Sequence, residues 1–256
     1  MDHVDFVDWS PGTLVTEMGE LVSYDLSGRV ATIAMDDGRA NALSLQMLAA
    51  VNEALDQAAA DDAVILLTGR DGIFSGGFDL NILGAGGPDA ALLLEQGFLL
   101  ALRLLEHPTP VVIACNGHAV AMGSFLLLSG DYRIGSDGPF RLVANEVAIG
   151  LTMPRAAIEI CRQRLPPAHF IRVVTLAEVY RPTDGVAAGF LDRVVGPADL
   201  LETAAEVAAG FAGLDRVAHA ATKSLARSAA VAAIQEGLEA DRAIFQRVAR
   251  GQVAGT

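Results

Sequence analysis

The run Asp61-Asp62-Ala63-Val64-Ile65-Leu66-Leu67-Thr68-Gly69 decides the fold class of this chain. Its central residues, 63–67, are all apolar, and two acidic residues and a glycine bound them. A short continuous apolar run of this kind predicts a β-strand that is buried on both faces, as in a parallel sheet. The run Val111-Val112-Ile113-Ala114, which follows two prolines, predicts a second strand of the same kind.

Strands and helices alternate around these two runs. Residues 21–27 and 29–35 predict a hairpin that turns at Gly28. A helix is expected over 44–60, because Ser44 is a good N-cap residue before apolar residues at helical spacing.

A glycine-rich loop is expected over 69–78. Further along we expect a helical region over 80–106 that breaks at 84–88, a turn with a buried helix over 117–130, and a short strand from Arg133. This order predicts an α/β fold with right-handed crossovers.

The last part of the chain has a different character. Helices are expected at 154–164, 167–177, 183–188, 199–211 and 217–248, with one strand at 191–195. We therefore divide the chain into an N-terminal arm (1–20), an α/β core (21–195) and a helical region (196–256) that packs on itself or on a partner chain.

Composition argues against several classes of protein. The 256 residues are 52% apolar and 19% charged, which favours a folded domain, and the formal net charge of −13 argues against binding of nucleic acid. The N-terminus lacks a secretory signal, and no apolar run reaches the roughly 20 residues that span a bilayer. Cys115 and Cys161 form neither a disulfide framework nor a metal site. These features predict a soluble, cytoplasmic protein without a bound metal.

Two loops of small residues are the first candidates for chemistry. Phe74-Ser75-Gly76-Gly77-Phe78-Asp79-Leu80 follows the first apolar strand, and Gly117-His118-Ala119-Val120-Ala121-Met122-Gly123 follows the second. Ligands of open α/β sheets bind at the carboxyl ends of the strands, where glycines let the backbone approach and amide groups attract negative charge. Two such loops side by side could form an oxyanion hole. The local pattern equally allows glycines that serve only tight turns and packing.

The chain resembles the crotonase (enoyl-CoA hydratase/isomerase) superfamily. The resemblance is carried, in order along nearly the whole chain, by Asn41-Ala42-Leu43-Ser44, by Leu66-Leu67-Thr68-Gly69 with the first loop, by Asn116-Gly117-His118-Ala119 with Gly130-Asp131-Tyr132-Arg133, and by Ala187-Ala188-Gly189-Phe190-Leu191-Asp192-Arg193-Val194-Val195. It implies a core of repeated β-β-α units and a helical C-terminal trimerisation region, in a trimer or a hexamer. It also implies an acyl-coenzyme A thioester as the substrate and no separate cofactor.

The resemblance assigns catalytic roles to three residues. The backbone N–H groups of Phe78 and Met122 would be the two oxyanion donors. Of the two glutamates that hydratases of the family use, the first position holds Phe125 and the second holds Glu146. An apolar residue at the first position and an Asn-Glu pair at the second are typical of the short-chain mitochondrial Δ3,Δ2-enoyl-CoA isomerases, so Glu146 would move a proton from C2 to C4 as the single acid/base.

Several weaker candidates line the expected site. Backbone near Ala40 and Ala42 would hold the adenine, and Arg39 or Lys223 would meet a phosphate; Ser75, Gly76, Gly77, Leu80, His118 and Phe125 would lie near the substrate. Asp79 is equally explained as the cap of a following helix, and His118 as a packed side chain. A hydratase, another thioester-enolate reaction such as hydrolysis or decarboxylation, and a non-catalytic acyl-CoA-binding protein remain alternatives.

Overall fold

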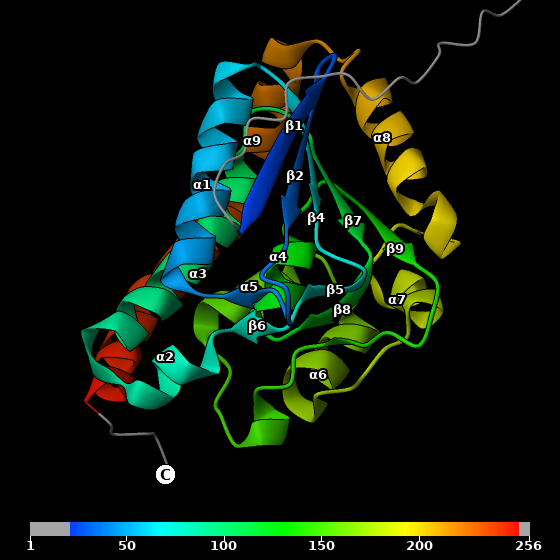
Figure 1. The fold of residues 1–256 in the computed structure, drawn as a ribbon. Helices are drawn as coiled ribbons and strands as arrows, with labels where there is room; N and C mark the ends of the chain where they lie inside the picture. Colours follow the sequence, from blue (N-terminus) through cyan, green and yellow to red (C-terminus); the bar gives the residue numbers. More distant parts are fainter. Residues whose placement is uncertain (1–20, 251–256) are drawn as a thin grey trace, which may run out of the picture.

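The computed structural model describes residues 21–250, which fold around a six-stranded sheet (Figure 1). The strands follow the order β1-β2-β4-β7-β9-β11, with β1 at Val22–Ser27, β2 at Val30–Met35, β4 at Val64–Thr68, β7 at Val111–Cys115, β9 at Tyr132–Ser136 and β11 at Arg193–Val195. The first pair is antiparallel and turns at Gly28, whose φ is +59°; all other pairs are parallel. The predicted hairpin and the predicted parallel sheet are confirmed.

Burial on both faces explains the apolar runs of the central strands. Every residue of β4 and β7 is buried. Ile65 and Leu67 belong to the large core that includes α1 (Leu45–Ala60) and α3 (Gly87–Glu106), whereas Val64 and Leu66 pack toward α8 (Leu200–Phe211) on the other face. Side chains alternate between the faces of a strand, so a sheet with helices on both sides needs apolar residues at every position.

A second, smaller sheet was not predicted. Strands β5 (Gly72–Ser75), β8 (Gly117–Val120) and β10 (Leu142–Val143) pair in parallel in the order β10-β8-β5, and β3 (Ala42–Leu43) pairs with β6 (Gly77–Phe78). The expected loop over 69–78 and the expected turn at 117 are therefore wrong, since both segments contain strands. Gly72 pairs with Gly117, and a Cβ added at Gly117 would lie 1.8 Å from the carbonyl carbon of Gly72. Such short, glycine-containing strands lack the alternation by which sequence patterns reveal strands.

The helices agree well with the sequence prediction. The expected break in the first helical region separates α2 (Leu80–Ala85) from α3 at Gly86 and Gly87, which both have positive φ. The remaining helices are α4 (Met122–Leu128), α5 (Arg155–Arg162), α6 (Pro167–Leu176), α7 (Pro182–Ala188) and α9 (Arg216–Ala249), with 3₁₀ turns η1 (Val147–Ile149) and η2 (Pro197–Asp199). Helix α9 packs against α3 and α5 (Figure 1). No helix within residues 21–250 is long and apolar enough to cross a membrane.

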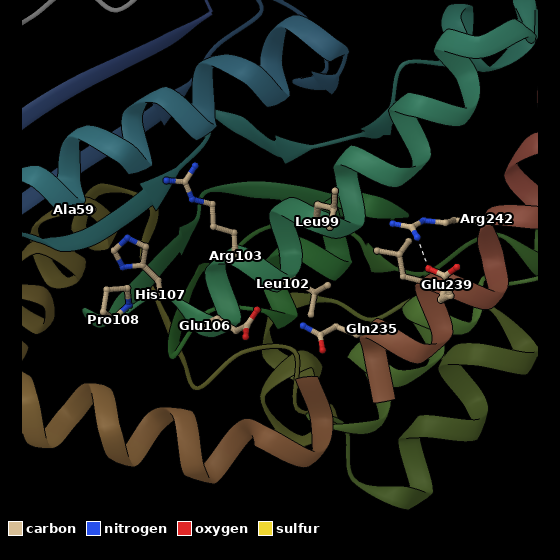
Figure 2. A pocket seen from close by; sticks show the side chains of 11 residues that line it. Ala59, Leu99, Leu102, Arg103, Glu106, His107, Pro108, Gln235, Glu239 and Arg242 are labelled. Atoms are coloured by element: carbon tan, nitrogen blue, oxygen red, sulfur yellow. Dashed lines mark hydrogen bonds and ion pairs between the residues drawn. The ribbon is translucent and has the colours of Figure 1, made fainter. Parts of the chain in front are cut away.

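A cavity of about 570 Å³ lies between the end of α1, the second half of α3, and α9 (Figure 2). Leu238 is part of its apolar wall, and its two arginines are paired within the protein. Arg103 is paired with Asp56, and Arg242 with Glu239. None of the residues that the sequence predicts for the site lines this cavity.

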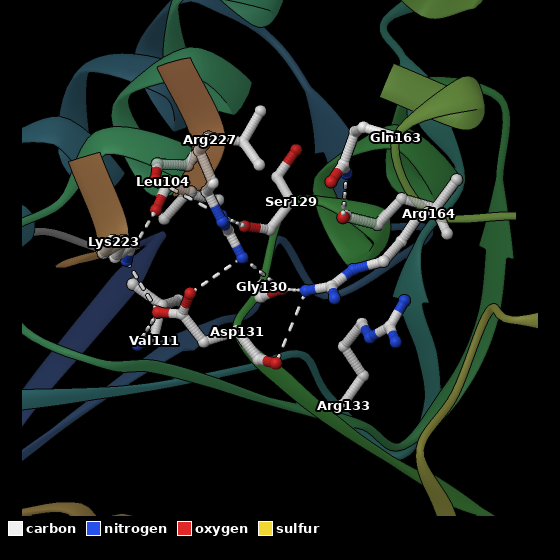
Figure 3. A network of polar contacts seen from close by, with 12 residues as sticks. Leu104, Val111, Ser129, Gly130, Asp131, Arg133, Gln163, Arg164, Lys223 and Arg227 are labelled. Atoms are coloured by element: carbon white, nitrogen blue, oxygen red, sulfur yellow. Dashed lines mark hydrogen bonds and ion pairs between the residues drawn. The ribbon is translucent and has the colours of Figure 1, made fainter. Parts of the chain in front are cut away.

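A network of charged side chains fastens α9 to the core (Figure 3). Both oxygens of the Asp131 carboxylate accept hydrogen bonds or ion pairs, at 2.6 Å from Nζ of Lys223, 2.8 Å from Nη2 of Arg227 and 2.8 Å from the backbone N of Val111. Arg227 also donates to the carbonyl oxygen of Leu105 at the end of α3 and to those of Ser129 and Gly130 after α4. Cations at the carboxyl ends of two helices are favourable because those ends carry partial negative charge.

Lys223 is part of this network. Its ammonium group is buried and paired with Asp131, and burial lowers its pKa to about 8 although Asp131 opposes the shift. The group thus has an anion within the protein, and its contact with a phosphate stays a prediction.

Candidate active site

The small parallel sheet brings together the three residues that the sequence assigns to catalysis. Parallel strands end at the same edge of their sheet. Phe78 follows β5 by three residues, Met122 follows β8 by two, and Glu146 follows β10 by three. Since the strand order is β10-β8-β5, Met122 comes from the central strand, between Glu146 and Phe78. The edge of this sheet is therefore the candidate site.

The backbone N–H of Phe78 points away from its neighbouring strand. In the β3–β6 pair Phe78 lies opposite Leu43, and the carbonyl oxygen of Leu43 accepts a hydrogen bond from the next residue, Asp79, at 3.2 Å. In a parallel ladder this pattern leaves the N–H of the intervening residue directed to the other side. The β3–β6 pairing therefore does not use this N–H.

The N–H of Met122 is the second free donor. Met122 is the first residue of α4, and the first N–H groups of a helix have no acceptor within it. Gly77 brings the two donors together: a Cβ added there would lie 2.9 Å from the carbonyl oxygen of Val120 and 3.4 Å from the amide nitrogen of Met122. The φ of Gly77 is +92°, so both space and conformation require glycine.

Backbone strain lies at Ala121, directly before Met122. Ala121 has φ +49° and ψ −122°, a region that residues with a side chain rarely adopt. Two hydrogen bonds hold it there, from the N–H of Ala121 to the carbonyl oxygen of Val143 at 2.9 Å and from the N–H of Ser124 to the carbonyl oxygen of Ala121 at 2.9 Å. Met122 itself is helical, so the strain belongs to its predecessor.

The side chains of Phe78 and Met122 pack against α3. A Cβ added at Gly97 would lie 2.4 Å from Cε1 of Phe78 and 3.5 Å from Cγ of Met122. The Phe78 ring also meets Phe98 edge-on, with centroids 6.3 Å apart and an interplanar angle of 70°. Glycine inside a helix costs roughly 0.5–1 kcal/mol relative to alanine. An isolated glycine in an apolar helix was therefore a signal of close packing that the sequence analysis did not use.

Phe125 is buried in an aromatic cluster. It is 1% exposed and stacks on Phe98 at 6.2 Å, and Phe98 stacks in turn on Phe245 of α9 at 6.1 Å. Phe125, which the resemblance assigns to the first glutamate position of the hydratases, is thus a buried aromatic ring with no acid–base capacity.

Glu146 is a buried carboxyl group with one oxygen that has no hydrogen-bonding partner. It directly precedes η1 and is 9% exposed, and its Oε2 has no partner among the described residues. Burial raises its pKa from the ordinary 4.5 to about 7, although its own backbone N–H acts in the opposite direction. Cys161 of α5 is a close neighbour: burial and, to a smaller extent, the charge of Glu146 raise the pKa of its thiol. A carboxyl group whose pKa lies near neutrality can both take up and release a proton.

The turn over 36–42 presents the backbone that the sequence assigns to the adenine. The carboxylate of Asp37 accepts hydrogen bonds from the backbone N–H groups of Arg39 at 2.7 Å, Asn41 at 2.8 Å and Ala42 at 2.8 Å. Burial works to raise the pKa of Asp37, but these bonds outweigh it and hold the pKa below its usual value. The carbonyl oxygen of Ala40 accepts from the N–H of Gly76 at 2.8 Å, so this turn adjoins the first loop. Arg39 is exposed there.

Three other predicted residues have local structural roles. Oγ of Ser75 donates to the carbonyl oxygen of Asn41 at 2.8 Å, and Asp79 caps α2 by accepting from the N–H of Asn81 at 2.8 Å. Nδ1 of His118 accepts from the backbone N–H of Arg141 at 3.1 Å, which supports the packed alternative for this side chain. Leu80 is 74% exposed beside the site. Among residues 21–250, no group of three His, Cys, Asp or Glu side chains is arranged to hold a metal ion.

Comparison with known proteins fits this geometry. The family model for enoyl-CoA hydratase/isomerase matches residues 25–253. The chain belongs to this family.

Two solved structures of one protein from Mycobacterium tuberculosis are similar to the whole fold. In one it is described as a probable enoyl-CoA hydratase, 44% identical, with a TM-score of 0.86 over 90% of this chain and 98% of that chain. In the other it is described as an enoyl-CoA isomerase, 45% identical, with a TM-score of 0.83 over 87% of this chain and 97% of that chain. The human mitochondrial enoyl-CoA delta isomerase 1 is 27% identical over 86% of this chain and 75% of its own length. The resemblance stated from the sequence is confirmed at the level of the family, and enoyl-CoA enzymes of both kinds are among the relatives.

Proposed function

We propose that this protein is a Δ3,Δ2-enoyl-CoA isomerase in which Glu146 is the single acid/base. The observation that carries the proposal is the isolation of Glu146: a buried carboxyl group with a pKa of about 7 and a free Oε2, on a sheet edge where the equivalent of a second carboxylate is the buried ring of Phe125.

The proposed reaction is a proton transfer. The ionised Glu146 removes a proton from C2 of a 3-enoyl thioester, and the electron pair moves onto the thioester oxygen as an enolate. The enolate collapses as the protonated Glu146 returns the proton to C4, which gives the conjugated 2-enoyl thioester. Charge appears and disappears on one oxygen, so the chemistry needs no cofactor beyond the coenzyme A of the substrate.

The backbone donors stabilise the enolate in this scheme. The N–H groups of Phe78 and Met122 are held by the β3–β6 pair and by the start of α4, and preorganised donors of this kind are worth roughly 3–4 kcal/mol each. The turn over 37–42 is the proposed seat of the coenzyme A adenine, with Arg39 within reach of its phosphates.

An enoyl-CoA hydratase is the second candidate, because the same Mycobacterium tuberculosis relative is described as a probable hydratase in one structure and as an isomerase in the other. Hydration requires a group that orients and deprotonates water in addition to the group that manages the α-proton. Phe125 cannot perform that role, so the isomerase is favoured. A different thioester-enolate reaction or a non-catalytic acyl-CoA-binding protein would use the same donors.

The first experiment follows conjugation of a 3-enoyl-CoA by ultraviolet absorbance with wild-type protein, Glu146→Gln and the matched control Glu106→Gln, which changes an exposed glutamate at the end of α3. We expect turnover by the wild type and the control, a loss of at least about 100-fold in Glu146→Gln, and a wild-type rate that rises with pH and levels off above about 7. Hydration of a 2-enoyl-CoA in the absence of isomerisation would select the hydratase. Binding of acyl-CoA without either reaction, unchanged in Glu146→Gln, would select a binding protein.

A trimer or a dimer of trimers is the proposed assembly. Helix α9 exposes two large apolar side chains, Val217 at 80% and Leu225 at 78%. Their burial against another chain would remove this apolar surface from water. Sedimentation of the purified protein tests this, since a monomer would have a mass of 26.7 kDa.

A further inference from the structure

Asp241 is a buried carboxylate that the proposed mechanism does not use. It lies on α9, is 0% exposed, and makes no ion pair within residues 21–250. Its Oδ2 accepts a hydrogen bond from the backbone N of Ala156 at 3.0 Å, and its Oδ1 has no partner in the same part of the chain. A buried charge without a cation is strongly unfavourable unless other groups compensate it.

The start of α5 supplies the compensation. Helix α5 begins at Arg155 after Pro154, which has no side chain that can cap the first turn. Asp241 provides the missing acceptor from a different helix, and its negative charge faces the positive end of the α5 dipole. Gly237, one turn earlier on α9, allows the approach: a Cβ added there would lie 2.9 Å from the N of Ala156 and 3.0 Å from the carbonyl carbon of Arg155. Gly237 and Asp241 together form the surface of α9 on which the first turn of α5 packs. We call these two residues the α5 seat.

Helix α5 in turn borders Glu146. The segment 144–154 carries Glu146 and is held at one end by β10, where the carbonyl oxygen of Val143 accepts from the N–H of Ala121 at 2.9 Å and from Oγ of Ser124 at 2.9 Å. Its other end is the start of α5. Cys161, two turns into α5, is fully buried and close enough for the charge of Glu146 to act on its thiol. The position of α5 therefore determines where the segment 144–154 ends, and α5 also forms one side of the space around the Glu146 carboxyl group.

We propose that Asp241 is a positioning residue for Glu146: by holding the first turn of α5 on α9, it keeps the Glu146 carboxyl group in its buried place. This inference rests on the proposed role of Glu146. It extends the site to a helix that is distant in sequence, since Asp241 and Ala156 are 85 residues apart.

The test compares Asp241→Asn, which keeps the size and one acceptor but removes the charge, with Gly237→Ala, which forces α5 away from α9 by a Cβ. Asp192→Asn is the matched structural control, because it removes a buried ion pair with Arg133 on a different part of the sheet. With 3-enoyl-CoA as the substrate, we expect both seat variants to lower kcat about 10- to 100-fold while KM changes less than about threefold. We also expect the midpoint of the pH–rate profile to fall below 7 as the Glu146 carboxyl group gains water. Asp192→Asn should lower the melting temperature without moving that midpoint.

A second readout does not depend on turnover. The effect of Glu146→Gln on urea unfolding is measured across pH in the wild-type and the Asp241→Asn backgrounds, and the pH at which the effect appears should be lower in the second. The positioning role would be overturned if kcat and the pH midpoint were unchanged in both Asp241→Asn and Gly237→Ala while their melting temperatures fell as in Asp192→Asn. If the wild type has no isomerase activity but the unfolding midpoint still moves, the proposed function fails and the positioning of Glu146 stands.

Discussion

Glu146 should destabilise the folded protein above neutral pH, and its replacement by glutamine should remove that effect. Burial raises its pKa from 4.5 to about 7 in the folded state. Each tenfold change in a protonation equilibrium is worth about 1.4 kcal/mol, so the ionised carboxyl group disfavours the folded state by ~3 kcal/mol. Between pH 4.5 and 7 the folded protein retains a proton that the unfolded chain has released, so this contribution to stability is lost as pH rises through 7.

Urea unfolding of wild-type protein and Glu146→Gln, measured from pH 4.5 to 8.5, tests this linkage. The difference between the two proteins cancels the other titrating groups. We expect the smallest difference at pH 4.5, because the wild-type carboxyl group is fully protonated in both states only below this pH. From there the difference should grow in favour of the variant and level off above pH 7 at ~3 kcal/mol relative to its low-pH value. Glu106→Gln, on the exposed surface, should show no such trend. A pH-independent difference for Glu146→Gln would refute the buried, uncompensated carboxyl group and with it the base proposed for the reaction.

Two further predictions concern the strained backbone at Ala121 and the charged network around Asp131. Ala121→Gly should raise the free energy of unfolding by about 1 kcal/mol in urea titration, because glycine adopts φ +49° without the strain that alanine bears there; a loss of stability would place the strain elsewhere. Asp131→Asn should lower it by about 3–5 kcal/mol, because Lys223 and Arg227 would lose the carboxylate that compensates their burial. The double variant with Lys223→Met should recover part of that loss, and full additivity of the two changes would contradict direct pairing.

The large sheet could be predicted from the sequence because its signals are local. The apolar run that forms β4 carries the evidence for burial on both faces within five residues, and Gly28 marks the hairpin turn. The small sheet could not be predicted in the same way. Its strands have two to four residues, and the contact that defines it joins Gly72 to Gly117 across a distant part of the chain.

The candidate site likewise has features that the sequence predicts and features that it does not. Glu146, Phe78 and Met122 were assigned through motifs in order along the chain, and the parallel strands bring their positions to one edge. What the sequence could not give depends on distances between elements: the close packing at Gly97 and the burial that raises the pKa of Glu146. The strain at Ala121 arises where its backbone bonds to β10 and α4 begins, and no residue preference in the sequence predicts it.

The charge of the protein bears on how the site stabilises an anion. With a formal net charge of −13, the chain offers few cations, and Lys223, Arg227 and Arg133, which lie in the interior, are already paired with aspartates. In the proposed reaction the enolate would therefore depend on backbone dipoles, whose strength does not change with salt or with the protonation state of a side chain. It follows that substitution of the Phe78 or Met122 side chain should affect the donors less than a change at Gly77, because the conformation of the backbone directs the N–H groups. A base with a pKa near neutrality suits such a site, since it takes up the proton as the enolate forms and leaves no charged carboxylate beside the charge that the amides stabilise.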